Sequence, residues 1–190
     1  AGQAVSLPGV IVTAVGDDMF TVSVDPASDQ WDGPEFSAIY IYNPSGVAPP
    51  VGARADLEGE IGEFHGQIQL SFVTFSNVEE GVGTPTPPVV AAADVGKGGA
   101  LQQAYEAVLV TVLNVEVIDI DPPGEPNETP EGEFVVAGDL TVDDQLFLIA
   151  PPIFVGQVVP GLTGVLRWTW ERNKLLPRGP EDVNLGVPTL

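Results

Sequence analysis

The chain has 190 residues, of which 44% are hydrophobic, and it contains 22 glycines, 19 prolines and no cysteine. The apolar content argues against a disordered chain, and the lack of cysteine excludes disulfides, thiolate metal sites and cysteine nucleophiles. The formal net charge of -21 argues against nucleic acid as a partner, because binding phosphates requires Lys and Arg, and no segment has the roughly 18 uninterrupted apolar residues needed to span a bilayer.

Branched apolar residues separated by Gly and Pro predict an all-β fold. Four segments of the first half recur in the second half, in the same order and at similar spacing. They pair as follows: 9–13 with 107–112, 38–42 with 145–149, 57–61 with 162–166, and 69–70 with 174–175. Each half therefore predicts about five short strands, the number expected of a small Greek-key barrel of the OB type. Gly59 and Gly164 lie inside matching strands, where they predict a bulge or a corner.

The two halves are separated by a proline-rich segment. Residues 82–89 contain prolines at short intervals, which favour an extended, semi-rigid linker. We therefore expect a first OB-like barrel at 1–82, a Pro/Gly/Ala-rich linker at 83–99, and a second OB-like barrel at 100–190 that ends in an extended tail.

Segments 10–13, 57–59, 63–70, 105–110 and 174–183 together resemble the tandem OB-fold modules of exported bacterial surface proteins. These modules are related to the OB-like domains attached to extracellular nucleases. The resemblance implies a secreted protein, or one on the extracellular face of a bacterial cell envelope. It specifies strands and turns but no chemistry.

No catalytic residue is expected. His65 is the single histidine, and without cysteine it cannot build a closed zinc site. The sequence has no Gly-x-Ser-x-Gly elbow to present a serine nucleophile and no phosphate-binding loop in a strand-to-helix context. Two carboxylates are sufficient to hydrolyse a glycoside. Because the chain has 27 acidic residues, the presence of two carboxylates does not indicate a glycosidase. We predict neither an enzyme nor an organic cofactor.

An acidic, proline-containing loop at 119–131 lengthens the first hairpin of the second half. The residues in it with oxygens suited to Ca²⁺ are Asp119, Asp121, Glu125 and Glu128. Their spacing differs from that of an EF-hand loop. A solvated acidic loop is therefore the preferred interpretation, and a calcium site is the alternative.

Basic residues gather near the C-terminus, interleaved with tryptophans. The candidate ligand-binding residues are Arg167, Trp168, Trp170, Arg172, Lys174 and Arg178. On OB folds, aromatic and basic side chains together bind single-stranded nucleic acid. The alternative, which the net charge favours, is that one tryptophan packs in the core and the cations pair with carboxylates.

Two charge-free apolar stretches are long for exposed loops. The candidate assembly residues in them are Phe147, Ile149, Ile153, Phe154, Leu185, Val187 and Leu190. Exposed apolar patches mark interfaces, and a free strand edge can accept an extended segment of another chain. The alternative is that the first stretch covers its own barrel and that the tail is frayed.

The sequence therefore predicts a non-catalytic structural or interaction protein of the cell exterior. Its expected partners are other protein subunits, including copies of itself in a surface layer or fibre. The alternative is an accessory module that binds single-stranded nucleic acid or a glycan for an extracellular enzyme system.

Overall fold

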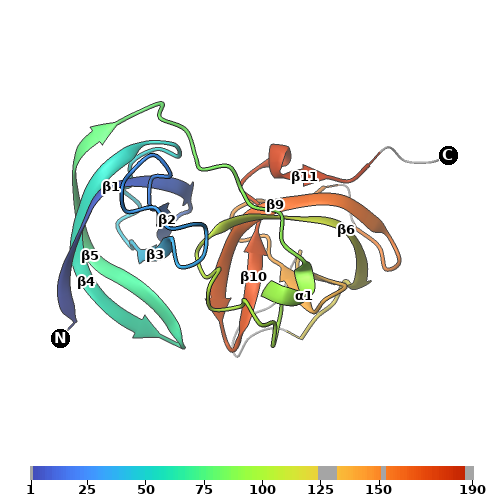
Figure 1. Ribbon diagram of the computed structural model, residues 1–190. Helices are drawn as coiled ribbons and strands as arrows, with labels where there is room; N and C mark the ends of the chain where they lie inside the picture. The colour runs from blue at the N-terminus through green and yellow to red at the C-terminus, as the bar shows by residue number, and fades with distance from the viewer. Residues whose placement is uncertain (1, 124–131, 151–152, 187–190) are drawn as a thin grey trace.

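The computed structural model describes residues 2–123, 132–150 and 153–186, and these are almost entirely strands and loops arranged in two lobes (Figure 1). The elements are β1 (Gln3–Val15), β2 (Met19–Ser23), β3 (Ala38–Tyr42), β4 (Arg54–Phe64), β5 (Gln67–Glu79), α1 (Ala92–Val95), β6 (Leu109–Asp119), β7 (Phe134–Val136), β8 (Leu140–Val142), β9 (Val158–Thr169), β10 (Arg172–Leu176), the 3₁₀ turn η1 (Pro180–Asp182) and β11 (Val183–Asn184). The predicted all-β class is confirmed.

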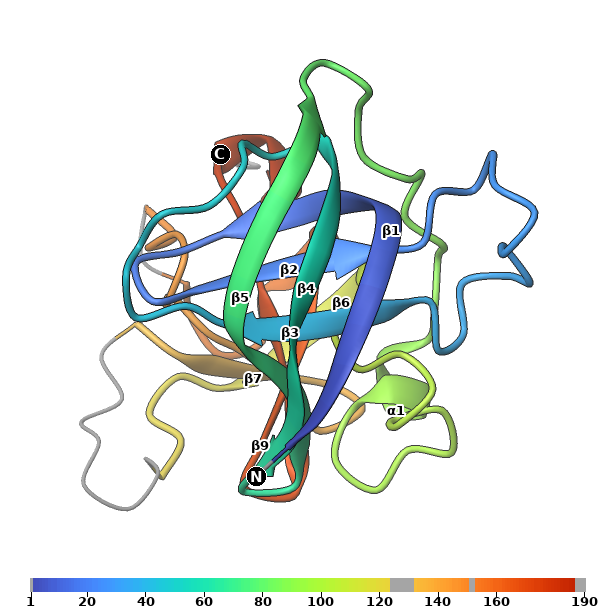
Figure 2. The same cartoon turned by 90° about the vertical axis from the view of Figure 1, so that its left-hand side faces the viewer.

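The first lobe is a closed barrel with strand order β1-β2-β3-β5-β4 (Figure 2). All neighbours are antiparallel except β3 and β5, which run parallel. The long strand β1 closes the ring because its first part pairs with β4 and its second part with β2. The change of partner follows a register shift between Leu7 and Val10. Gly9 lies in that shift with φ +63, a conformation that glycine adopts without steric cost.

The barrel is filled by inward-facing branched and aromatic side chains, and these follow the period-two alternation of strands. Its buried core residues are Val10, Val12, Phe20, Val22, Ile41, Ala55, Leu57 and Leu70. The predicted bulge at Gly59 is confirmed, because the β4–β5 register shifts between Glu58 and Glu60. The extra residue is on β5, and a Cβ at Gly59 would lie 2.9 Å from the carbonyl oxygen of Ser71.

The second lobe is a six-stranded sheet in the order β10-β8-β7-β6-β9-β11, in which β10 also pairs with β9. Strands β6 to β10 thus repeat the neighbour order of β1 to β5, with β8 and β10 parallel as β3 and β5 are. The strand expected at 145–149 is not formed; β8 at Leu140–Val142 takes that place in the order. The chain turns after β8, where the Asp143 carboxylate accepts a hydrogen bond from Gln145 N at 2.8 Å, and Leu146 packs from the following loop.

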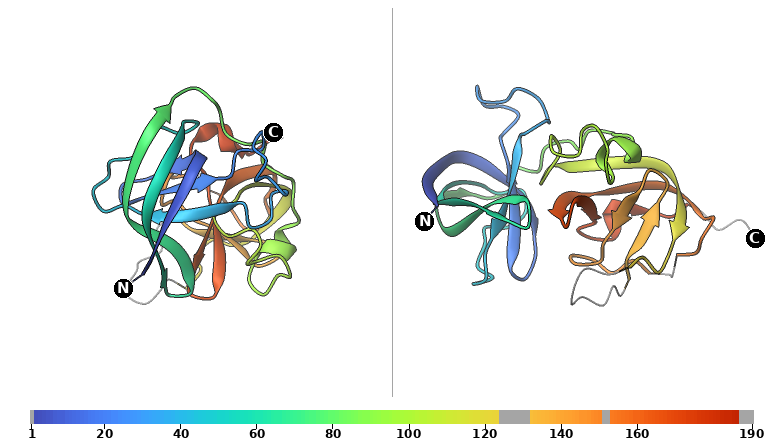
Figure 3. Two further views of the ribbon diagram at one scale, coloured as in Figure 1. Left: turned by 60° about the vertical axis from the view of Figure 1, so that its left-hand side comes forward. Right: turned by 90° about the horizontal axis from the view of Figure 1, so that it is seen from below.

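Residues 80–91 connect the two sheets across one side of the molecule (Figures 1 and 3). The segment is held at both ends, because Gly83 N bonds to Gly52 O at 2.9 Å and Val89 forms a parallel bridge with Thr111. The loop between β2 and β3 projects from the first lobe (Figures 2 and 3). In this loop Phe36 N donates to Ala104 O at 2.6 Å, so the lobes contact each other directly.

Aromatic and basic side chains strengthen the contact between the lobes. The rings of His65 and Trp170 stack with centroids 4.2 Å apart. Arg178 donates from Nη1 to Thr13 O at 3.1 Å. Leu146 packs against buried residues of both lobes, so the lobes are joined by an apolar contact as well as by the connecting chain.

Candidate functional site

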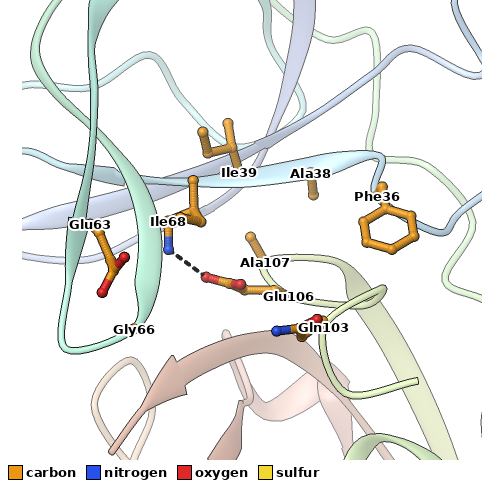
Figure 4. A pocket seen from close by; sticks show the side chains of 9 residues that line it. All are labelled: Phe36, Ala38, Ile39, Glu63, Gly66, Ile68, Gln103, Glu106 and Ala107. Atoms are coloured by element: carbon orange, nitrogen blue, oxygen red, sulfur yellow. Dashed lines mark hydrogen bonds between the residues drawn. The ribbon is translucent and has the colours of Figure 1, made fainter. Parts of the chain in front are cut away.

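A cleft of about 480 Å³ lies between the two lobes (Figure 4). The end of the β2–β3 loop, strand β3 and the β4–β5 hairpin form one side, and the turns that precede β6 form the other. The lining residues are Phe36, Ala38, Ile39, Glu63, Gly66, Ile68, Gln103, Glu106 and Ala107. The cleft exists only because the lobes are docked, so both halves of the chain contribute to it.

Glu106 is the titratable group of this cleft with an altered pKa. Its Oε1 accepts a hydrogen bond from Ile68 N at 3.0 Å across the lobe contact (Figure 4). Burial raises the pKa of Glu106 to about 7, and the hydrogen bond from Ile68 offsets part of that rise. This carboxyl therefore changes charge near neutral pH while it is in contact with the opposite lobe.

A second candidate site lies on the outer face of the first barrel, beside the parallel pairing of β3 and β5. Two pockets of about 320 and 370 Å³ share Tyr42 and Gln69, and we call them together the aromatic groove. Its lining residues are Asp18, Tyr40, Tyr42, Asn43, Pro44, Ser45, Phe64, Gln67, Gln69, Ser71, Phe72, Val73 and Arg167. Aromatic rings with neutral amides and hydroxyls dominate this set.

Phe72 is the most exposed aromatic side chain of the groove. It is 84% exposed, and its φ of +55 is a rare conformation for a bulky residue. It lies in the β5 bulge opposite Gly59, and bulges re-aim side chains beside functional sites. An exposed ring held by an unfavourable backbone conformation is the kind of feature that a binding surface retains.

The polar groups of the groove are largely buried or already hydrogen-bonded. Gln67 is 3% exposed, and its Nε2 has no hydrogen-bond partner among the described residues. Arg167 is already engaged, since Nη1 donates to Gln145 Oε1 at 2.8 Å and the guanidinium lies 5.9 Å from the centre of the Tyr40 ring. Burial raises the pKa of Tyr40 to about 12, so its hydroxyl remains neutral.

The structure distributes the six predicted ligand-binding residues over several environments. Arg167 alone lines the aromatic groove. Trp168 is half-buried, with its indole nitrogen close to Gly66, and Trp170 stacks on His65. Both tryptophans thus serve the contact between the lobes.

The remaining three belong to the second lobe. Arg172 is half-buried on β10, and Lys174 is buried and paired with two carboxylates. Arg178 forms an ion pair with Asp182 at 2.7 Å. These positions do not form one continuous basic surface.

The residues proposed for calcium lie partly outside the described chain. Asp119 Oδ1 accepts a hydrogen bond from Asp121 N at 3.0 Å, a local turn contact. Glu125 and Glu128 are not among the described residues. Within 2–123, 132–150 and 153–186, no group of three or more His, Asp or Glu side chains is arranged to hold a metal ion.

The candidate assembly residues divide between core and surface. Ile149, Ile153 and Leu185 pack against the second core, and Phe147 is half-buried. Phe154 is exposed, as are the apolar residues Leu148, Val155 and Val158. Val187 and Leu190 lie outside the described residues.

Comparisons with protein-family models, with curated proteins and with solved structures find no match. None of the helices in the described part of the chain has the length and apolar character needed to cross a membrane.

Proposed function

We propose that the chain is a non-catalytic interaction protein of the bacterial cell exterior, built from two OB-like barrels, and that its first barrel binds a neutral saccharide chain in the aromatic groove. The observation that carries this proposal is the strained, exposed Phe72, which lines the groove together with Tyr42.

The position of the groove supports an OB-like assignment. OB-type barrels bind oligonucleotides and oligosaccharides on the face of strands 2 and 3, between the loops that follow strands 1 and 4. Here Asp18 comes from the β1–β2 turn, Tyr42 from β3, and Gln67 from the start of β5 after the β4–β5 turn. The repeated strand order of the second lobe agrees with a tandem arrangement.

The chemistry of the groove favours a neutral polyhydroxyl ligand. Apolar sugar faces pack on aromatic rings, and sugar hydroxyls exchange hydrogen bonds with amides such as that of the half-buried Gln69. A nucleic acid would need free cations along its backbone. The single basic residue that lines the groove, Arg167, is already paired with Gln145, and the net charge is -21.

The test is titration calorimetry with three soluble neutral polysaccharides, a β-glucan, a mannan and a galactan, and with a 20-nucleotide oligothymidylate at low salt. We expect at least one polysaccharide to bind and Phe72→Ala to weaken binding about fivefold, since an aromatic contact is worth about 1 kcal/mol. Phe154→Ala is the matched control, because this exposed phenylalanine lies on the other lobe. Binding of the oligonucleotide but of no polysaccharide, or equal losses in both variants, would overturn the proposal.

Self-association is a second candidate function, favoured by the exposed apolar residues Leu148, Phe154, Val155 and Val158 of the second lobe. Exposed apolar side chains mark protein interfaces where they gather on one face. The first barrel is closed and leaves no free strand edge among its described residues. For this barrel, packing of one subunit's surface against another is therefore better supported than addition of a strand. We expect sedimentation velocity to show concentration-dependent oligomers that Phe154→Ser reduces. A monomer at every concentration up to the millimolar range would contradict this second function.

A further inference from the structure

A cluster of three charged side chains lies inside the second lobe. Lys174, Glu133 and Asp143 are 1%, 7% and 5% exposed. Lys174 Nζ lies 2.5 Å from Glu133 Oε1 and 3.0 Å from Asp143 Oδ2. An amine and a carboxyl are thus held in contact in a place that water hardly reaches.

Strand pairing brings these residues together from distant parts of the chain. Lys174 is on β10, Asp143 follows β8 directly, and Glu133 precedes β7. The parallel register places Lys174 opposite Thr141, and Asp143 N donates to Leu175 O at 2.9 Å. The flanking residues Phe134, Val142 and Leu175 are buried hydrophobics, so the cluster has an apolar surrounding.

Such a cluster is an unusual way to stabilise a core. The free-energy cost of desolvating two or three charges offsets much of the free energy gained from their attraction. Replacing a buried ion pair by apolar residues is therefore often neutral or stabilising. Holding a nucleophile against its target in a fixed geometry, by contrast, accelerates a reaction by orders of magnitude. The arrangement has the components of an amide-forming site: an amine, a carboxyl and a second acid beside both.

We propose that Lys174 and Asp143 condense to an intramolecular isopeptide bond, with Glu133 as the proton relay. The reaction joins Nζ of the lysine to Cγ of the aspartate and releases one water molecule. It needs no oxidant, reductant or external activating group.

The atoms needed for each step are in place. A proton first passes from the ammonium of Lys174 to the Asp143 carboxylate, and the apolar surrounding reduces the free-energy cost of this exchange because two opposite charges are removed. The neutral amine then attacks Cγ, and the charge that develops on Oδ1 is stabilised by the N–H of Gln145, 2.8 Å away. Glu133 takes the proton that Nζ must lose and gives one to Oδ2, which leaves as water.

The protonation of Glu133 agrees with this role. Burial raises its pKa to about 7, and the neighbouring charge of Asp143 raises it further against the opposing hydrogen bond to Lys174. Burial lowers the pKa of Lys174, but the attraction of Asp143 and Glu133 outweighs burial and raises it. The lysine therefore begins as an ammonium, and the internal proton transfer is the step that makes it nucleophilic.

The test is the intact mass of the purified full chain under denaturing conditions, compared with the mass calculated from the sequence. We expect a deficit of one water (about 18 Da). Trypsin should release residues 173–178 still joined to residues 98–167. Lys174→Arg and Glu133→Gln should both restore the calculated mass, and circular dichroism of each variant shows whether the fold is retained. The matched control is Lys97→Arg, which changes the chain's other lysine and should keep the deficit.

The outcomes separate this bond from other events. A wild-type chain with the calculated mass would overturn the proposal and leave the cluster as a buried ion pair. A deficit that persists in Lys174→Arg would also overturn it, because dehydration at an Asp-Gly step such as Asp32-Gly33 produces the same mass without the lysine. Neither result depends on whether the aromatic groove binds a saccharide.

Discussion

Replacing Glu106 with Gln tests the contact between the lobes through its pH dependence. The folded state raises the pKa of this carboxyl from 4.5 to about 7, so folding favours the protonated form. A raised carboxyl pKa contributes stability below pH 4.5, and that contribution is lost as the pH rises through 7. Gln is neutral at every pH and retains an oxygen that can accept the hydrogen bond from Ile68 N.

The size of the effect follows from the pKa. One pKa unit corresponds to about 1.4 kcal/mol, so the full difference would give an upper value of about 3 kcal/mol. Glu106 is only partly buried, and solvent screening reduces the value to about 1–2 kcal/mol. We therefore expect Glu106→Gln to be more stable than the wild type by about 1–2 kcal/mol at pH 8, and to match it at pH 4.5.

Urea unfolding followed by tryptophan fluorescence, at half-unit steps from pH 4.5 to pH 8.5, measures this difference. Glu63→Gln is the matched control, because Glu63 is an exposed residue of the same cleft and its replacement removes the same charge. The control measures how much stability the chain gains simply because one negative charge has been removed. A stability difference for Glu106→Gln that does not change with pH, or that follows the control, would refute burial as the cause of the raised pKa.

Three further substitutions replace residues of the second lobe, one of which contacts the first lobe. For each, chemical denaturation measures the free energy of unfolding. Trp170→Ala removes the stack on His65 and is expected to cost about 1 kcal/mol; no loss would mean that the stack does not couple the lobes. Asn173→Ala leaves two buried backbone carbonyls without their donor and should cost about 2–4 kcal/mol; a neutral result would contradict their burial. Gly164→Ala places a Cβ 2.5 Å from Leu176 O and should cost about 1–3 kcal/mol; unchanged stability would contradict this close approach.

The strands of the first barrel could be predicted because their side chains alternate between the core and the surface. The segments expected at 9–13, 38–42 and 57–61 fall within β1, β3 and β4. In the second lobe the same pattern is misleading at 145–149, since Leu146 and Ile149 pack from a loop. Strands β7 and β8 have three residues each, too few for an alternating pattern to be distinguished.

The sites could not be predicted because tertiary contacts create them. Glu106 is charged and sits between turn residues, and its burial comes from docking against Ile68, 38 residues earlier in the chain. Phe72 continues the apolar alternation of its strand until the bulge turns it outward. Lys174 carries a charge that sequence reasoning assigns to the surface, yet Glu133, 41 residues away, neutralises it inside the lobe.

The few cations of this chain favour the proposal of a neutral ligand. Of six basic residues, Arg54 pairs with Asp25, Arg167 with Gln145, Lys174 with Glu133 and Arg178 with Asp182. Four of the six are thus engaged within the protein, and the acidic residues that remain dominate its surface. An anionic polymer would have to compete with these contacts for four of the six cations, at a free-energy cost that each new phosphate contact would have to offset. A neutral saccharide needs only rings and amides, which the aromatic groove offers without disturbing the ion pairs.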